Sequence, residues 1–266
     1  MRILRTIAEV REALPREHVG LVPTMGALHA GHIALFGAAR QENEIVVASI
    51  FVNPAQFAAG EDFERYPRDQ RADADLAEAA GVDFLFVPAV EEIYPEGFAT
   101  WVEVERVSDR LEGEARPGHF RGVATVCLKL FNIVSPARAY FGQKDAQQAA
   151  VVERMVCDLN LDLEIRVVAT VRDEDGLAVS SRNAYLSAEE RGAALALPQA
   201  LRAGAVAHEQ GADPVEAAEA VLTAEPGLER EYVDVARLDG RVYLLAAARA
   251  GRTRLIDNVV LEGDLL

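Results

Sequence analysis

The stretch that decides the fold runs from residue 18 to residue 52 and reads HVGLVPTMGALHAGHIALFGAARQENEIVVASIFV. Its two ends, His18–Val22 and Glu44–Val52, are apolar and rich in β-branched residues, which is typical of buried strands. Pro23–Gly26 is predicted to break the first strand, and a helix is predicted over about Gly31–Glu42. Strand, glycine-containing turn, helix and strand in succession form a βαβ unit, which implies a parallel sheet.

The same alternation continues as far as Val171. Further helices are predicted over Thr6–Leu14, Asp69–Ala80, Gly122–Ile133 and Asp145–Leu159, and further strands over Val82–Val87, Thr100–Val107, Ala137–Phe141 and Leu163–Val171. We therefore expect residues 1–171 to form a Rossmann-like α/β domain with an open parallel sheet. Ligands of such sheets bind at the carboxyl ends of the strands.

The pattern changes after Val171. Arg172–Gly176 is a polar turn suited to a hinge, and Ser187 and Asp213 each stand where a helix N-cap is expected. Three strands are predicted after these helices, over Glu231–Leu238, Arg241–Ala247 and Thr253–Leu261. Residues 172–266 are therefore expected to form a second, smaller α+β domain with an antiparallel sheet, which serves as a lid.

Charge and composition exclude several classes of partner. The formal net charge of −16 argues against nucleic acid and anionic membranes, because both need a basic surface. No stretch approaches the roughly 18 apolar residues of a membrane span, and the N-terminus lacks a signal-peptide pattern, so we expect a cytoplasmic protein. Cys127 and Cys157 lie in apolar segments and are expected to be core residues, and no metal site is predicted.

The segment Met25–His32 (MGALHAGH) directly follows a predicted strand and opens a predicted helix. A helix N-terminus presents N–H groups and a positive dipole end, which together favour phosphate. His29 and His32 are three residues apart, so they lie on the same side of the first turn and both could reach one phosphate group. Taken alone, the segment also fits a tight turn with two surface histidines.

Gln56 and Lys144 follow the ends of two other predicted strands. Gln56 is an amide near a strand end, although Asn53 and Pro54 before it also suit an ordinary turn. The chain contains only two lysines, Lys129 and Lys144, and Lys144 stands just before a predicted helix start. A lysine there can supply a point charge to phosphate oxygens while the helix start supplies N–H groups. The alternative is a capped surface helix with an incidental lysine.

A third polar segment, Leu177–Asn183, lies just past the expected hinge. It contains Ser180, Ser181 and Arg182, whose hydroxyl and guanidinium groups are good donors to phosphate oxygens. The segment could close over a nucleotide, or it could be a polar turn before a helix.

The segment His29–His32 resembles the HxGH signature of the nucleotidyltransferase superfamily, and the longer string Pro23–His32 resembles the pantothenate synthetase family. The resemblance extends from about Arg5 to Leu261. It implies that His29, His32 and Lys144 are catalytic. It implies an ATP site made of Met25, Gly26, Ala27, Leu28, His29, Ala30, Gly31, His32, Gly142, Gln143, Lys144, Asp145, Val171, Val179, Ser180, Ser181 and Arg182.

The same resemblance implies a pantoate and β-alanine site with Asn53, Gln56 and Gln148. Glu112 and Arg116 belong to a region that lines the active site in the family. Two positions depart from the family pattern: many relatives have Glu where Gln143 stands, and they often have Met where Val179 stands. Neither change touches Lys144.

The resemblance implies an ATP-dependent ligase that activates pantoate as an acyl adenylate, joins it to β-alanine, uses Mg²⁺ with ATP and works as a homodimer. One alternative is another nucleotidyltransferase, which couples a nucleotide to a phosphorylated cofactor precursor and would not require Gln56 and Gln148. A second alternative is a non-enzymatic module that senses adenine nucleotides. A dinucleotide-binding dehydrogenase is disfavoured, because no G-x-G-x-x-G follows the first strand.

Overall fold

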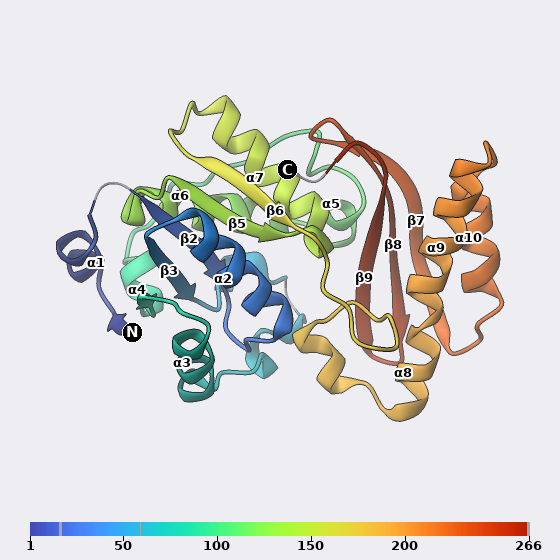
Figure 1. The fold of residues 1–266 in the computed structure, drawn as a ribbon, viewed down its shortest axis with the longest axis horizontal. Helices are drawn as coiled ribbons and strands as arrows, with labels where there is room; N and C mark the ends of the chain where they lie inside the picture. The colour runs from blue at the N-terminus through green and yellow to red at the C-terminus, as the bar shows by residue number, and fades with distance from the viewer. Residues whose placement is uncertain (16–17, 59, 265–266) are drawn as a thin grey trace. The chain divides into compact units, whose positions relative to one another are not determined.

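The computed structural model describes residues 1–15, 18–58 and 60–264. The chain divides into two compact units (Figure 1). The first unit consists of Met1–Phe141 and Gln147–Val168, and the second consists of Gly142–Ala146 and Ala169–Leu266. The short segment Gly142–Ala146 thus belongs to the second unit, although the chain on both sides of it belongs to the first.

The first unit is built on a six-stranded sheet with the order β1-β4-β3-β2-β5-β6. Its strands are β1 (Arg2–Leu4), β2 (Val19–Thr24), β3 (Ile45–Ile50), β4 (Phe84–Phe86), β5 (Arg138–Gly142) and β6 (Glu164–Val168). The pairs β1–β4, β3–β4, β2–β3 and β2–β5 are parallel. The expectation of a Rossmann-like open parallel sheet is therefore confirmed.

Helices flank this sheet (Figure 1). They are α1 (Ile7–Ala13), α2 (Ala30–Glu42), α3 (Gln70–Ala79), α4 (Val90–Ile93), α5 (Glu112–Ala115), α6 (His119–Val134) and α7 (Ala146–Asp158). Short 3-10 turns lie at η1 (Pro54–Gln56), η2 (Asp62–Arg65) and η3 (Gln143–Asp145). A core formed by β2, β3 and β4 with α2 and α3 includes the fully buried Phe36, Ala77 and Leu85.

One predicted strand is wrong. Thr100–Val107 alternates like a strand, but it forms no strand in the structure. Side chains rather than a neighbouring strand bond two of its backbone groups: the N–H of Val102 donates to Thr125 Oγ1 at 3.0 Å, and Val107 O accepts from Gln147 Nε2 at 2.8 Å. A backbone that is satisfied in this way has no need of a ladder partner.

Two further details of the sheet differ from the prediction. The sheet gains an edge strand, β1, which is only three residues long and was not predicted. Pro23 does not end β2, which pairs with β3 as far as Thr24. Proline lacks an N–H, but the pairing of β2 with β5 stops at Leu21, so the ladder loses little at Pro23.

The second unit is a small α+β structure, as the sequence predicts. Its helices are α8 (Ala188–Ala194), α9 (Ala196–Glu209) and α10 (Pro214–Thr223), and η4 (Ser181–Tyr185) is a 3-10 turn. Its antiparallel sheet has the order β7-β8-β9, with β7 at Leu228–Leu238, β8 at Arg241–Ala250 and β9 at Thr253–Glu262. Helices α9 and α10 cover one face of it (Figure 1).

Local capping signals are confirmed. Thr6 and Ser187 form capping boxes with Glu9 and Glu190, and the side chain of Asp213 accepts from the N–H groups of Val215 and Glu216. The helix expected after Ser187 is divided at Leu195 into α8 and α9.

The domain boundary at residues 171 and 172 and the role of the smaller domain as a lid stay predictions.

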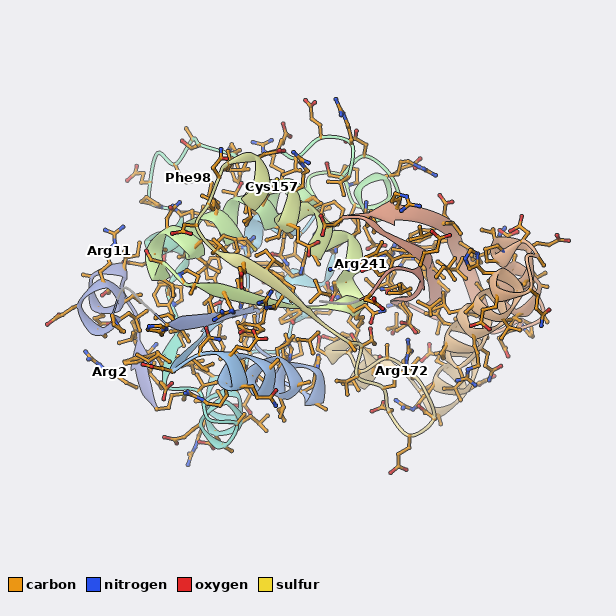
Figure 2. The ribbon with its side chains drawn as sticks, turned by 45° about the horizontal axis from the view of Figure 1, so that its top comes forward. Arg2, Arg11, Phe98, Cys157, Arg172 and Arg241 are labelled. Carbon is orange, nitrogen blue, oxygen red and sulfur yellow. The ribbon has the colours of Figure 1, made fainter. Side chains whose placement is uncertain are left out.

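The two cysteines differ in burial. Cys127 lies in the core, and burial raises its pKa to about 12. Cys157 is exposed near the end of α7 (Figure 2), so its assignment to the core is wrong. The buried positions of α7 include Val151, Val152 and Met155, and Cys157 lies off that face.

No helix in the described part of the chain is both long enough and apolar enough to cross a membrane.

Candidate active site

The two histidines of the HxGH segment cap the helix that follows them. His29 is the N-cap of α2, and its Nδ1 accepts the N–H of Gly31 at 3.2 Å. The N–H of His29 in turn donates to Nδ1 of His32 at 3.2 Å, and the ring centroids lie 4.1 Å apart. Because Nδ1 accepts in both rings, each neutral imidazole carries its proton on Nε2. Each ring thus has an N–H of the kind that binds a phosphate oxygen.

Asp73 of α3 holds the loop before these histidines, and the sequence analysis missed it. Its carboxylate is buried and accepts the N–H groups of Ala27 at 2.9 Å and Leu28 at 2.7 Å. Gly26 and Ala27 both have left-handed backbones, with φ of 81° and 52°. A Cβ on Gly26 would lie 2.7 Å from Asp73 Oδ2, so the loop requires glycine there. Asp73 looks like an ordinary polar helix residue in the sequence, so no local signal marks it.

Asn53 and Gln56 form one hydrogen-bonded turn after β3. The side chain of Asn53 is fully satisfied by protein groups. Its Oδ1 accepts from Ala55 N–H and Tyr94 Oη–H, and its Nδ2 donates to Gln56 Oε1 and to Gly122 O, both at 3.1 Å. Gln56 Nε2 lies 3.0 Å from Met25 Sδ, beside the HxGH loop. The structure therefore brings Gln56 to the loop of Met25 within the first unit.

Arg116, His119 and Glu61 form a cluster behind the backbone of Gln56. The guanidinium of Arg116 binds both carboxylate oxygens of Glu61, at 2.7 and 2.8 Å. His119 Nδ1 lies 2.9 Å from Gln56 O, and since a carbonyl oxygen only accepts, Nδ1 donates. His119 Nε2 therefore accepts from Arg116 Nη1, 3.1 Å away. His119 was not predicted, whereas Arg116 was.

The cluster fixes the charge of each member. Burial, and then the charge of Arg116, lower the pKa of His119 to about 4, so this ring is neutral at neutral pH. Burial alone would raise the pKa of Glu61, but its hydrogen bonds and ion pair with Arg116 outweigh burial and hold that pKa below its usual value. The cluster is thus a neutral imidazole held between a backbone carbonyl and a partly buried ion pair.

We expect His119 to make the folded state sensitive to acid. Above its ordinary pKa of 6.5 the ring is neutral in both states. As the pH falls from 6.5 towards 4, the unfolded chain binds a proton that the folded chain does not, so stability falls, by up to about 3 kcal/mol in total. Below pH 4 the folded chain also takes up the proton, and this loss ends. Urea unfolding of His119→Asn should show a shallower decline between pH 7 and 4.5. Parallel pH curves for the two proteins would contradict the assignment.

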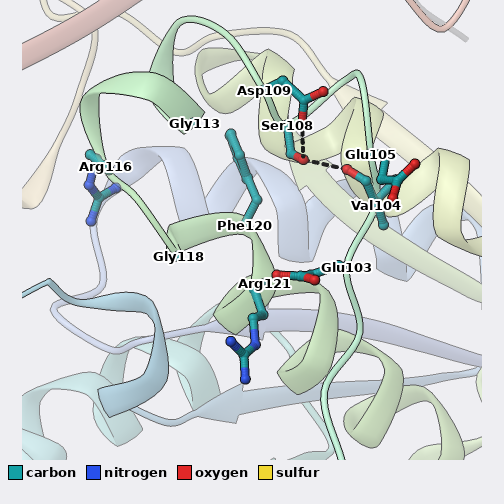
Figure 3. A pocket seen from close by; sticks show the side chains of 10 residues that line it. All are labelled: Glu103, Val104, Glu105, Ser108, Asp109, Gly113, Arg116, Gly118, Phe120 and Arg121. Atoms are coloured by element: carbon teal, nitrogen blue, oxygen red, sulfur yellow. Dashed lines mark hydrogen bonds between the residues drawn. The ribbon is translucent and has the colours of Figure 1, made fainter.

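A hollow of about 310 Å³ lies beside Arg116 (Figure 3). Its lining includes Arg116, Arg121, Glu103 and Asp109, and the buried Phe120. Neither His29, His32 nor Gln56 lines it. The hollow is therefore distinct from the predicted nucleotide segment.

The adjacent glutamines at the start of α7 have different surroundings. Gln147 is buried: it donates to Val107 O and Arg110 O, both at 2.8 Å, and it accepts from the N–H of Glu112 at 3.0 Å. Glu112, the first residue of α5, is also buried. Gln148, the predicted pantoate ligand, is only partly buried. The sequence did not reveal that Gln147 is structural.

The other predicted nucleotide residues lie in the second unit. Lys144 is partly buried in η3, with Nζ 3.5 Å from Asp145 Oδ1. Val171 and Val179 share a backbone hydrogen bond, in which the N–H of Val179 donates to Val171 O at 3.0 Å. Ser180 caps η4, where its Oγ accepts the N–H of Arg182 at 3.3 Å. Within residues 1–15, 18–58 and 60–264, no group of three or more His, Cys, Asp or Glu side chains could hold a metal ion.

The fold and the capped histidine pair define the class of this protein. A parallel α/β sheet whose β2 strand leads directly into a His-x-Gly-His helix start is an α/β fold of the HxGH nucleotidyltransferase type. The sequence model of the family described as pantoate-beta-alanine ligase matches residues 2–260. The chain belongs to this family.

Named relatives agree with the family assignment. The pantothenate synthetase of Moorella thermoacetica is 53% identical over 280 residues, which cover 98% of this chain and 99% of that protein. The pantothenate synthetase of Chloroflexus aurantiacus is 52% identical, with 99% of each chain covered.

Two solved structures are similar along the whole chain. The crystal structure of pantothenate synthetase from Thermus thermophilus has a TM-score of 0.96 at 50% identity and covers 99% of this chain and 100% of that chain. The pantoate-beta-alanine ligase of Francisella tularensis, in complex with beta-gamma ATP and beta-alanine, has a TM-score of 0.84 at 35% identity, with 100% of each chain covered.

Proposed function

We propose that this chain is an ATP-dependent ligase that joins pantoate to β-alanine through a pantoyl adenylate. The observation that carries the proposal is the pair His29 and His32, fixed as Nε2–H donors at the start of α2 in a member of this family. The Francisella tularensis relative, in complex with beta-gamma ATP and beta-alanine, supports the choice of two of the substrates.

The reaction has two steps. A pantoate carboxylate oxygen attacks the α-phosphorus of ATP, the bond to the β-phosphate oxygen breaks, and pyrophosphate leaves. The amine of β-alanine then attacks the acyl carbon, loses a proton and expels AMP as the amide forms. A carboxylate is a poor acyl donor because its leaving group would be oxide, and adenylation supplies a phosphate leaving group instead.

The first step builds negative charge on the departing pyrophosphate. His29 and His32 donate Nε2–H groups to phosphate oxygens, and Lys144 supplies a compact positive charge. Ser180, Ser181 and Arg182 add hydroxyl and guanidinium donors, while the backbones of Met25–Gly31 and Gly142–Asp145 line the nucleotide. Val171 and Val179 share a hydrogen bond on either side of the Arg172–Ala178 bridge and lead into the serine segment.

Pantoate is bound by Gln56 and Gln148, whose amides suit hydroxyl and carboxylate groups. Because all four hydrogen-bonding positions of Asn53 are used within the protein, its contribution is to orient Gln56. Arg116 and His119 hold the carbonyl of the same glutamine from behind.

Magnesium enters as part of the substrate MgATP. Mg²⁺ keeps several waters and binds substrate phosphates together with one or two carboxylates. Magnesium supplies charge neutralisation to the phosphates.

Residues 172–266 are proposed to act as a lid domain that keeps water from the mixed anhydride. From the family resemblance we also expect the protein to form a homodimer and to be located in the cytoplasm.

Isotope exchange between ATP and pyrophosphate tests the proposal. We expect exchange in the presence of magnesium and pantoate, without any need for β-alanine, because the adenylate forms before the amine reacts. Addition of β-alanine should then yield pantothenate and AMP. Exchange without pantoate would favour another nucleotidyltransferase, and binding of ATP without any pyrophosphate release would favour a sensing module.

A further inference from the structure

The strand β9 buries two adjacent polar residues, Asp257 and Asn258, with only 3% and 2% of their surfaces exposed. Neighbouring side chains in a strand point to opposite faces, so the two carry different contacts. A buried polar group is costly unless it is hydrogen-bonded, and both of these groups are bonded. Their partners lie in the two segments of the second unit to which nucleotide binding is assigned above.

Asn258 holds the turn that contains Lys144. Its Nδ2 donates to Gln143 O at 2.8 Å and to Lys144 O at 3.0 Å, and its Oδ1 accepts from Gln143 Nε2 at 3.1 Å. Gln143 Oε1 lies 3.4 Å from the N–H of Thr170 and accepts from it. The backbone position of Lys144 is therefore set by a side chain more than a hundred residues later in the sequence.

Asp257 holds the second segment. Its carboxylate binds the guanidinium of Arg172 through both oxygens, at 2.6 and 3.0 Å, and Oδ1 also accepts the N–H of Asn258 at 2.8 Å. Arg172 (Figure 2) is the first residue of a short hairpin, Arg172–Ala178, and its guanidinium also donates to Gly176 O at 3.2 Å. Arg172 also forms an antiparallel bridge with Ala178, directly before Val179 and Ser180.

We propose that Asp257 and Asn258 form a positioning pair that sets the Lys144 turn and the Arg172–Ala178 hairpin in one fixed arrangement for adenylate formation. Neither side chain touches substrate in this proposal; Asn258 acts through Lys144, and Asp257 acts through Arg172. The proposal rests on the proposed function, because it assigns the pair to the pyrophosphate-releasing step. Displacement of a catalytic group by about 1 Å can cost about 10²-fold in rate, so a backbone anchor of this kind has a measurable effect.

A double-mutant cycle on the full-length protein tests the proposal. Asn258→Ala should lower pantoate-dependent ATP–pyrophosphate exchange by about 10- to 100-fold. In a Lys144→Ala background the same change should add no more than about twofold, since the group it positions is already absent. Transfer of preformed pantoyl adenylate to β-alanine should stay within about twofold of the unmodified protein.

Asn258→Ser keeps a buried polar group and is measured in the same double-mutant cycle. It keeps the test valid if the alanine variant folds poorly. Thr253→Val is the control, because Thr253 is also buried on β9 but is the first residue of the strand, whereas Asn258 lies in its middle. Its effect on exchange should be within about twofold and should combine additively with Lys144→Ala.

Asp257→Asn tests the second arm. It keeps the shape of the side chain but loses the charge that binds Arg172, so exchange should fall while transfer from preformed adenylate persists. Additive losses for Asn258 and Lys144, or equal losses in both half-reactions with the fold retained, would overturn the positioning pair. Absence of pantoate-dependent exchange in the unmodified protein would instead overturn the proposed function, so the two failures are distinguishable.

Discussion

Lys144→Ala is expected to slow adenylate formation by about 10²–10³-fold, the scale for removing one preorganised donor to developing charge. The backbone of Lys144 is held in η3 by the side-chain amide of Asn258, which donates to Lys144 O at 3.0 Å. The chain has a net charge of −16 and only two lysines, Lys129 and Lys144. Pantoate-dependent ATP–pyrophosphate exchange measures the loss.

Two substitutions control this result. Lys144→Arg should recover only part of the rate, because a wide planar fork does not replace a compact ammonium. Lys129→Ala removes the other lysine of the chain, which lies over the ring of Phe98 at 4.7 Å, and it should leave exchange close to that of the unmodified protein. If Lys144→Ala slows transfer from preformed pantoyl adenylate as much as it slows exchange, Lys144 has no specific role in pyrophosphate release.

His29→Asn should separate the structural role of this residue from its chemical role. Asparagine is among the best N-caps, and its side-chain oxygen can accept the N–H of Gly31 as His29 Nδ1 does. It has no counterpart of the Nε2–H group. We therefore expect the thermal midpoint to change little, while adenylate formation falls by about 10²-fold.

The comparison with His29→Ala sharpens this prediction. Alanine removes both the cap and the donor, so it should add a stability loss of about 1 kcal/mol to a similar loss of exchange. Thermal unfolding and exchange are measured on both variants. Full exchange activity in His29→Asn would show that the ring serves only as a cap.

Local signals explain why much of the fold could be predicted. The βαβ unit over residues 18–52 is contiguous, and each cap at Thr6, Ser187 and Asp213 is defined within three residues of sequence. The prediction of a strand over Thr100–Val107 was wrong because alternation of apolar and polar residues marks a strand only if a neighbouring strand is available. Here Thr125 and Gln147, both distant in sequence, take its backbone groups.

The same distinction holds for the site. His29 and His32 are three residues apart, so the N-cap and first turn of α2 place their rings together. Asp73, His119 and Asn258 are different, since each acts on a backbone at least 45 residues away in the chain. Only the tertiary fold makes these contacts, and one sequence without relatives carries no signal of them.

The assignment of Gly142–Ala146 to the second unit has a consequence for how the protein is made. This segment leaves the ribosome long before β9, yet the partner of its two carbonyl oxygens is Asn258, close to the C-terminus. Translation of the first unit therefore ends with the Lys144 turn still lacking its anchor. The Lys144 turn is therefore anchored only after β9 has been synthesised, and a gene cut between residues 168 and 169 yields two fragments that divide one compact unit between them.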